Sequence, residues 1–149
     1  WDGVLIAAGS ISDGASVRAV EVLGADFAYM GTRFIATRES LAPQAYKQMI
    51  VDCGASDIVY TDVVSGTNAN FLAPSLEKAG YDRAQLAASS GKGSLHGLSD
   101  EARAWRDVWS AGHGVATIHD IPTVAELVER LVVEYRAASA LPASAAVVL

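Results

Sequence analysis

Cysteine and histidine are scarce in this sequence. Cys53 is its single cysteine, so no intrachain disulfide can form and nothing favours an oxidising compartment. We interpret Cys53 as a thiol at the end of a helix, because a buried free cysteine behaves as a small hydrophobic residue. The three histidines, His96, His113 and His119, lack the spacing of metal ligands, and we therefore predict no metal site.

Long apolar runs and an excess of basic charge are also missing. No run approaches the roughly 18 apolar residues of a membrane-spanning helix, and no signal-peptide pattern stands at the start of the sequence. We therefore expect a cytoplasmic protein that does not enter a membrane. Eleven basic residues stand against 17 acidic ones, for a net charge of -6, and this balance disfavours nucleic-acid binding.

Two common nucleotide-binding motifs fail in detail. The stretch GSISDG has Ile11 where a dinucleotide-binding turn has its middle glycine. The stretch SSGKGS resembles part of a P-loop, but Leu86 stands in place of its first glycine, and Gly93 stands where Ser or Thr would follow Lys92. We read residues 88–98 as a flexible loop.

The residues that are present predict one globular α/β domain. Hydrophobic residues make up 51% of the 149 residues, which is enough for a core. The apolar run at 3–9 reads as a fully buried strand and the short apolar run at 25–31 as a second strand, with a helical pattern at 14–23 between them. Asp13 is a suitable N-cap for this helix and Gly24 a suitable stop. This order is typical of a parallel strand–helix–strand unit.

Further elements follow this unit. The last helix is the clearest, because apolar residues recur every three or four positions over 123–135 and Thr123 with Glu126 fits a capping box. Asp57, Asp62 and Asp120 read as caps and turn formers. The uncharged tail after the last helix is either frayed or docked on a partner. The other expected elements are helices at 43–53, 74–79 and 100–111 and a strand at 57–64.

Both apolar runs of the first unit end in a glycine followed by a hydroxyl residue. Gly9-Ser10 and Gly31-Thr32 would let the backbone approach a ligand, and amides near a helix start attract phosphate. In an eight-stranded β/α barrel, the loops after the last two strands often build a phosphate site. The alternative is that both are only tight strand-to-helix turns.

The sequence VLIAAGSISDG…AVEVLGADFAYMGTRFIATRES resembles the nitronate monooxygenase family, also called 2-nitropropane dioxygenases. Three later stretches resemble further blocks of that family: Tyr46-Lys47, SGTNANFL at 65–72 and WSAGHGVATI at 109–118. The matching residues of the first block are Gly9, Asp13, Gly14, Leu23, Gly24, Ala25, Asp26, Met30, Gly31, Thr32, Arg33, Phe34, Glu39 and Ser40.

The resemblance implies a flavin mononucleotide (FMN) enzyme on a (β/α)8 TIM-type barrel, of which this chain is the C-terminal part with an added helical and loop elaboration. The last two barrel strands and their phosphate loops would occupy 3–40, and the elaboration 41–120. A packing helix at 121–138 and a tail at 139–149 would follow. The rest of the barrel is expected from a preceding part of the chain.

The resemblance also implies which residues bind the cofactor. Ser10 replaces the family's second glycine, and His113 stands where the family usually has glutamine beside the flavin ring, so His113 would contact the ring or the substrate. The family's catalytic histidine has no counterpart here. The expected cofactor-binding residues are Ala8, Gly9, Ser10, Tyr29, Met30, Gly31, Thr32, Gly112 and His113.

The expected activity is oxidation of alkyl nitronates by molecular oxygen, with a small molecule as substrate. Three alternatives remain open. One is an FMN-dependent reductase of enoyl thioesters with a nicotinamide donor, and another is a barrel fragment that binds a phosphorylated ligand without catalysis. The last is a flavin-free barrel enzyme that handles a sugar phosphate. A homodimer is left open as well.

Overall fold

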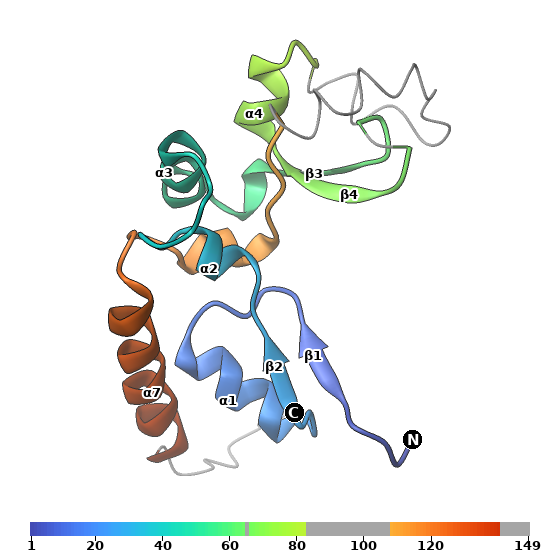
Figure 1. Cartoon of the computed structure of the whole chain (residues 1–149). Coiled ribbons are helices and arrows are strands. Elements are labelled where there is room, and N and C mark those ends of the chain that lie inside the picture. The colour runs from blue at the N-terminus through green and yellow to red at the C-terminus, as the bar shows by residue number, and fades with distance from the viewer. Residues whose placement is uncertain (65, 83–107, 141–149) are drawn as a thin grey trace, which may run out of the picture.

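A computed structural model of the chain describes residues 1–64, 66–82 and 108–140, and it shows a mixed α/β fold. The strands β1 and β2 with the helices α1 and α7 form one part of the molecule, called here the barrel unit (Figure 1). A second part contains α3, α4, β3 and β4, and we call it the elaboration. The short helix α2 lies between the two parts. None of the described helices is long and apolar enough to cross a membrane.

The barrel unit is a parallel strand–helix–strand motif, as the sequence predicts. β1 (Ile6–Ala8) pairs in parallel with β2 (Phe27–Tyr29), and α1 (Gly14–Val22) connects them. The Asp13 side chain accepts a hydrogen bond of 2.7 Å from the amide of Ser16, which confirms the predicted N-cap. After α1, Gly24 adopts a φ of 99°, the left-handed conformation that ends many helices.

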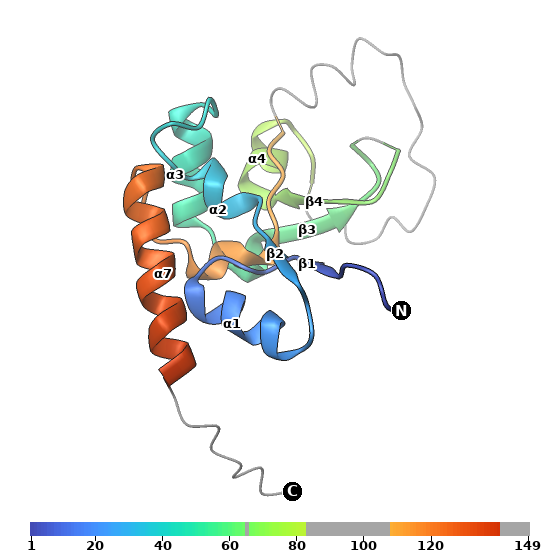
Figure 2. The same ribbon diagram turned by 60° about the horizontal axis from the view of Figure 1, so that its bottom comes forward.

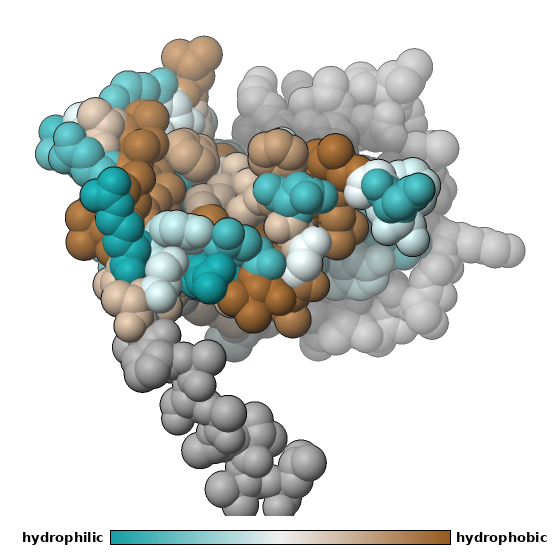
Figure 3. Space-filling view, turned by 90° about the horizontal axis from the view of Figure 1, so that it is seen from below, coloured by the Kyte–Doolittle hydropathy of each residue, from teal (hydrophilic) through white to brown (hydrophobic). Residues whose placement is uncertain are grey.

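The expectation that the strand at 3–9 is fully buried is wrong for this chain, and β2 is exposed as well. The described sheet has only these two strands, so no other strand covers the face that carries Ile6 and Phe27, whose exposed fractions are 59% and 62%. From below, large apolar patches alternate with polar ones on the surface (Figure 3). The exposed large apolar residues of β1, α1, β2 and their flanks are Val4, Leu5, Ile6, Val22, Leu23, Phe27 and Tyr29.

The elaboration contains the expected elements, and the structure adds three short elements in and beside it. The helix α3 (Gln44–Asp52), the strand β3 (Ile58–Thr61) and the helix α4 (Ala73–Lys78) fall at the predicted places. A short 3-10 turn η1 (Ala55–Asp57) precedes β3. The strand β4 (Ala69–Leu72), which pairs antiparallel with β3, and the one-turn helix α2 (Thr32–Ile35) were not predicted.

The core of the described residues lies mainly in the elaboration. One cluster joins α3 and β4 to the segment after residue 110, and a second surrounds Phe71 and Leu76. Cys53 follows α3 and is 8% exposed; burial raises the pKa of its thiol, in agreement with the interpretation of an unreactive residue. The largest fully buried side chains are Phe71, Ile50, Leu72, Leu76, Ile118, Leu127 and Val115.

Residues 109–120 form an arm that runs from the elaboration back to the barrel unit (Figure 1). The described residues 108–111 are not helical, contrary to the predicted helix over 100–111, because Ser110 instead bridges to Phe71 of β4. The 3-10 helix η2 (His113–Thr117) follows. The expected loop at 88–98 with His96, most of that helix and the tail from 141 lie outside the described residues.

The last helix, α7 (Val124–Ala140), packs along α1, as Figure 2 shows. The predicted capping box is present: the amide of Thr123 donates to the Glu126 carboxylate over 2.8 Å, and the amide of Glu126 donates to Thr123 Oγ1 over 3.2 Å. The two helices touch closely at Gly14, where a Cβ atom would lie 2.2 Å from the carbonyl oxygen of Leu131. Only glycine fits this contact.

Candidate functional site

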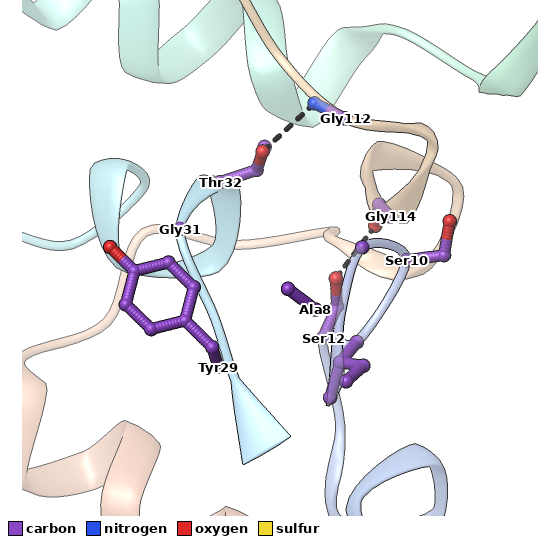
Figure 4. Close-up of a pocket in the computed structure, with 10 residues that line it drawn as sticks. Ala8, Ser10, Ser12, Tyr29, Gly31, Thr32, Gly112 and Gly114 are labelled. Atoms are coloured by element: carbon purple, nitrogen blue, oxygen red, sulfur yellow. Dashed lines mark hydrogen bonds between the residues drawn. The ribbon is translucent and has the colours of Figure 1, made fainter. Parts of the chain in front are cut away.

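A cavity of about 190 Å³ opens where β1 and β2 end (Figure 4). Tyr29 and Ala8 stand on its two sides, and Thr32 and Gly112 lie at one end. The cavity is smaller than the roughly 300–1,000 Å³ of a complete small-molecule pocket, so it suits one end of a ligand. Its lining residues are Ala8, Gly9, Ser10, Ile11, Ser12, Tyr29, Gly31, Thr32, Gly112 and Gly114.

Residues of the loops after the two strands line this cavity, and several of their backbone amides are not used by the fold. Gly9 and Ser10 both adopt positive φ angles, 95° and 56°, which turn the chain sharply after β1. In the described part of the chain, the amides of Ser10, Ile11 and Thr32 donate no hydrogen bond. A Cβ atom added at Gly31 meets nothing within 4 Å, so the space beside this residue is open to a ligand.

The start of α1 does not contribute amides, although the sequence suggested it. The amide of Ser16 is bonded to the Asp13 carboxylate, and the amide of Gly14 donates to Glu134 of α7 over 2.8 Å. Two carboxylates therefore occupy the helix N-terminus, where an anionic ligand would otherwise be favoured. An anion in the cavity is left with the amides of the strand-end turns and of α2.

None of the described residues that line the cavity carries a charged side chain. Arg33 lies in α2 next to Thr32, but its buried guanidinium is 3.0 Å from an oxygen of the Asp120 carboxylate and also donates to the Asp120 backbone carbonyl. A hydrogen bond from Arg130 is the main cause that lowers the pKa of Asp120. Asp120 is therefore an ion-pair partner rather than the predicted cap or turn former.

The structure gathers most of the residues singled out by sequence reasoning. Met30 and His113 do not line the cavity; the His113 side chain is exposed, although both neighbouring glycines line the cavity. Sequence reasoning missed Ile11, Ser12 and Gly114. The hydroxyl of Ser12, three positions after Gly9, could have indicated a residue of the site. Its hydrogen-bond partner Gly114 lies 102 positions away in the sequence, so the contact itself could not be predicted.

Tyr46 and Lys47 support the arm and the α2 region instead of lining the cavity. The Tyr46 ring stacks on Trp109 at 5.0 Å between centroids, and its hydroxyl donates to the carbonyl of Ser110. Burial raises the pKa of Tyr46. The buried Lys47 donates to the carbonyl of Arg38 over 3.1 Å. The Tyr46 contacts hold the start of the arm that carries Gly112 and Gly114, and the Lys47 contact holds the segment after α2.

Comparison with curated proteins finds nitronate monooxygenases. The chain is 31% identical to the nitronate monooxygenase of Pseudomonas aeruginosa over 144 residues, which cover 89% of this chain and 39% of that protein. It is 42% identical to the probable nitronate monooxygenase of Staphylococcus haemolyticus over 65 residues, 44% of this chain and 18% of that protein. The chain thus spans less than half the length of these relatives.

Solved structures give the same result for the fold. The nitroalkane oxidase of Streptomyces ansochromogenes matches 93% of this chain and 41% of its own, with a TM-score of 0.72 and 28% identity. The M276A mutant of FabK from Thermotoga maritima matches 93% of this chain and 43% of its own, with a TM-score of 0.68 and 28% identity. These are TIM-barrel enzymes, and the expected α/β barrel fold is confirmed. The nitronate monooxygenase family model matches residues 4–134, and the chain therefore belongs to the nitronate monooxygenase family.

Proposed function

We propose that the cavity at the ends of β1 and β2 holds the phosphate of FMN, and that the protein is an FMN-dependent oxidoreductase acting on alkyl nitronates with oxygen. The observation that carries this proposal is the pair of adjacent strand-end turns with unused amides around one cavity. Two parallel neighbouring strands bring these turns together, as the register Ala8 with Tyr29 shows.

The residues present fit a phosphate group. The open space beside Gly31 is large enough for an atom where a Cβ would stand, and the amides of Ser10 and Thr32 have no partner among the described residues. Backbone amides at such turns form anion-binding concavities. Since none of the described lining residues is charged, peptide dipoles rather than a basic side chain would balance the phosphate.

The chain's own residues would bind and orient the cofactor. Thr32 Oγ1 accepts a hydrogen bond from the amide of Gly112, so its own proton is available to a phosphate oxygen. Tyr29 and Ala8 would flank the group on its two sides. FMN supplies the redox chemistry when bound, and the protein supplies position and electrostatics. His113 lies one residue from Gly112 and is our candidate for a contact with the ring or substrate.

A reductase acting on enoyl thioesters is the second candidate. The chain is about as similar in structure to FabK as to nitroalkane oxidase, with TM-scores of 0.68 and 0.72. The phosphate end of the site would be the same in both enzymes. This chain matches 43% of the FabK chain and 41% of the nitroalkane oxidase chain. The substrate end of the site would depend on residues outside these matched parts. A cytoplasmic location and a homodimer remain predictions.

Flavin retention tests the proposed phosphate site. Gly31→Val places a branched side chain in the space now open, and we expect the purified protein to lose its visible flavin absorbance. The control is Gly54→Ala, whose Cβ would make an ordinary contact of 3.9 Å with the Asp57 carboxylate, away from the residues that line the cavity, and should retain the flavin. Full flavin content in Gly31→Val would contradict the site.

The reagent that bleaches the flavin separates the two activities. For a nitronate monooxygenase, we expect an alkyl nitronate to bleach the flavin absorbance without oxygen, and oxygen to restore it. NADH or NADPH alone should have little effect. Rapid bleaching by a nicotinamide donor without nitronate would favour the reductase and contradict the first candidate.

A further inference from the structure

The turn that carries His113 is fastened on both sides to the strand-end loops. The amide of Gly112 donates to Thr32 Oγ1 over 2.9 Å, and Ser12 Oγ donates to the carbonyl of Gly114 over 3.1 Å (Figure 4). Thr32 is the first residue of α2, directly after the loop that follows β2, and Ser12 lies in the loop after β1. The two hydrogen bonds join residues that are 80 and 102 positions apart in the sequence.

Packing at Gly114 leaves this turn little freedom to shift. A Cβ atom at Gly114 would lie 2.3 Å from Ser12 Oγ and 3.4 Å from Ser10 Cα, so the arm rests directly on the loop after β1. Ser12 is 5% exposed, so its side chain is almost fully shielded from water. A displacement of the Ser10 loop must therefore displace Gly114 as well, because closely packed atoms transmit strain.

The two hydroxyls have different hydrogen-bonding capacity left. The Thr32 hydroxyl accepts a hydrogen bond from Gly112 and can still donate its proton to a ligand. The Ser12 hydroxyl already donates its only proton to the carbonyl of Gly114. Ser12 can thus hold the arm without donating to an anion in the cavity. This makes Ser12 a cleaner probe of the arm's position than Thr32.

We infer that Ser12 and Thr32 are positioning residues that hold the His113 turn against the phosphate loops, so that an anion bound between the loops and the placement of His113 depend on each other. The inference rests on the proposed phosphate site. An anion held only by amides requires the two loops to adopt one conformation. The hydrogen bonds of Thr32 and Ser12 then also fix the positions of Gly112 and Gly114, the two neighbours of His113. The conformation of the phosphate loops and the position of His113, the residue expected beside the flavin ring, would then depend on each other.

Nuclear magnetic resonance with inorganic phosphate as the probe tests this inference. We expect phosphate to shift the amide signals of Ser10 and Thr32 and also the ring signal of His113, which the variant His113→Gln identifies. In Ser12→Ala, phosphate should bind about fivefold more weakly, the effect of one hydrogen bond, and the His113 shift at saturation should disappear. Thr37→Val is the matched control, because it also removes a buried hydroxyl, one whose hydrogen bond of 2.8 Å goes to the carbonyl of Phe34 and not to a residue of either loop.

The second pair of variants covers the case in which Ser12→Ala does not fold. Thr32→Ser keeps the acceptor for Gly112 and should retain the His113 shift, whereas Thr32→Val should lose it. Wild-type behaviour of His113 in Ser12→Ala or in Thr32→Val would overturn the inference. Amide shifts at Ser10 and Thr32 without any His113 shift in the wild type would also overturn it and leave the phosphate site intact. No amide shift at all would instead overturn the phosphate site, and the inference with it.

Discussion

The barrel unit and the elaboration are built in different ways, although both contain a pair of strands. β3 and β4 enclose a core in which Phe71 and Leu72 have no exposed surface. β1 and β2, which carry the candidate site, leave Ile6 and Phe27 more than half exposed. The cavity at their ends therefore depends on contacts between the strand-end segments and the arm. Thr32 and Ser12 form hydrogen bonds with Gly112 and Gly114 of the arm, and Arg33 forms an ion pair with Asp120.

The largest effect should come from removing equivalent aromatic side chains in the two parts. Phe71→Ala should lower the free energy of unfolding by about 3–5 kcal/mol, because a fully buried ring leaves a cavity. Phe27→Ala, with 62% of the residue exposed, should cost less than about 1 kcal/mol. Chemical denaturation measures both. Equal losses would show that the face of Phe27 is covered in solution.

The second prediction sharpens the comparison within the barrel unit. Gly14→Ala should lower the free energy of unfolding by about 1–3 kcal/mol or more, because its Cβ would overlap the backbone of Leu131 and Tyr135 at 2.2 and 2.4 Å. Gly31→Ala is the control, since its Cβ meets nothing within 4 Å. Similar thermal unfolding temperatures for the two variants would contradict the close contact of α1 with α7.

The third prediction concerns the ion pairs that connect the arm to α2 and α7. The pKa of Asp120 lies below its usual value of 3.8, mainly through the hydrogen bond from Arg130. A carboxylate with a lowered folded-state pKa stabilises the protein at neutral pH, and this stabilisation is lost as the pH falls through that pKa. Asp120→Asn should therefore be less stable at pH 7 and less sensitive to acid below about pH 4. An unchanged acid limb of the stability profile would contradict the assignment.

The smallest effect is expected at Ser10. Its φ of 56° costs a residue with a side chain about 1 kcal/mol, so Ser10→Gly should stabilise the protein by up to that amount. The Ser10 hydroxyl points away from Tyr29 in Figure 4, and the loss of this hydroxyl should leave flavin binding unchanged. The dissociation constant of FMN, measured by fluorescence, checks the second part; a tenfold weakening would show that the hydroxyl contacts the phosphate.

Local signals in the sequence predict the helices well. Asp13 and the Thr123–Glu126 box mark the starts of α1 and α7, and Gly24 ends α1, because caps involve residues only a few positions apart. The strand β4 was missed because ANFL is short and its partner β3 lies in a separate stretch. The burial of β1 was overestimated because an apolar run does not show how many strands cover it.

In the candidate site too, features that depend on neighbouring residues were predictable and contacts between distant residues were not. Glycine followed by a hydroxyl residue at the end of an apolar run indicated the turns at Gly9 and Gly31, and the structure brings both to one cavity. The occupation of the α1 N-terminus by Glu134, and the hydrogen bond of Ser12 to Gly114, join distant parts of the chain. No local pattern in a single sequence reports such contacts.

The position of the FMN phosphate in a crystal structure of the flavin-loaded protein tests the central claim most directly. The account predicts phosphate oxygens within about 3.2 Å of the amide nitrogens of both Ser10 and Thr32, beside Gly31. A phosphate bound outside the cavity between the ends of β1 and β2, or one that contacts neither amide, would contradict it.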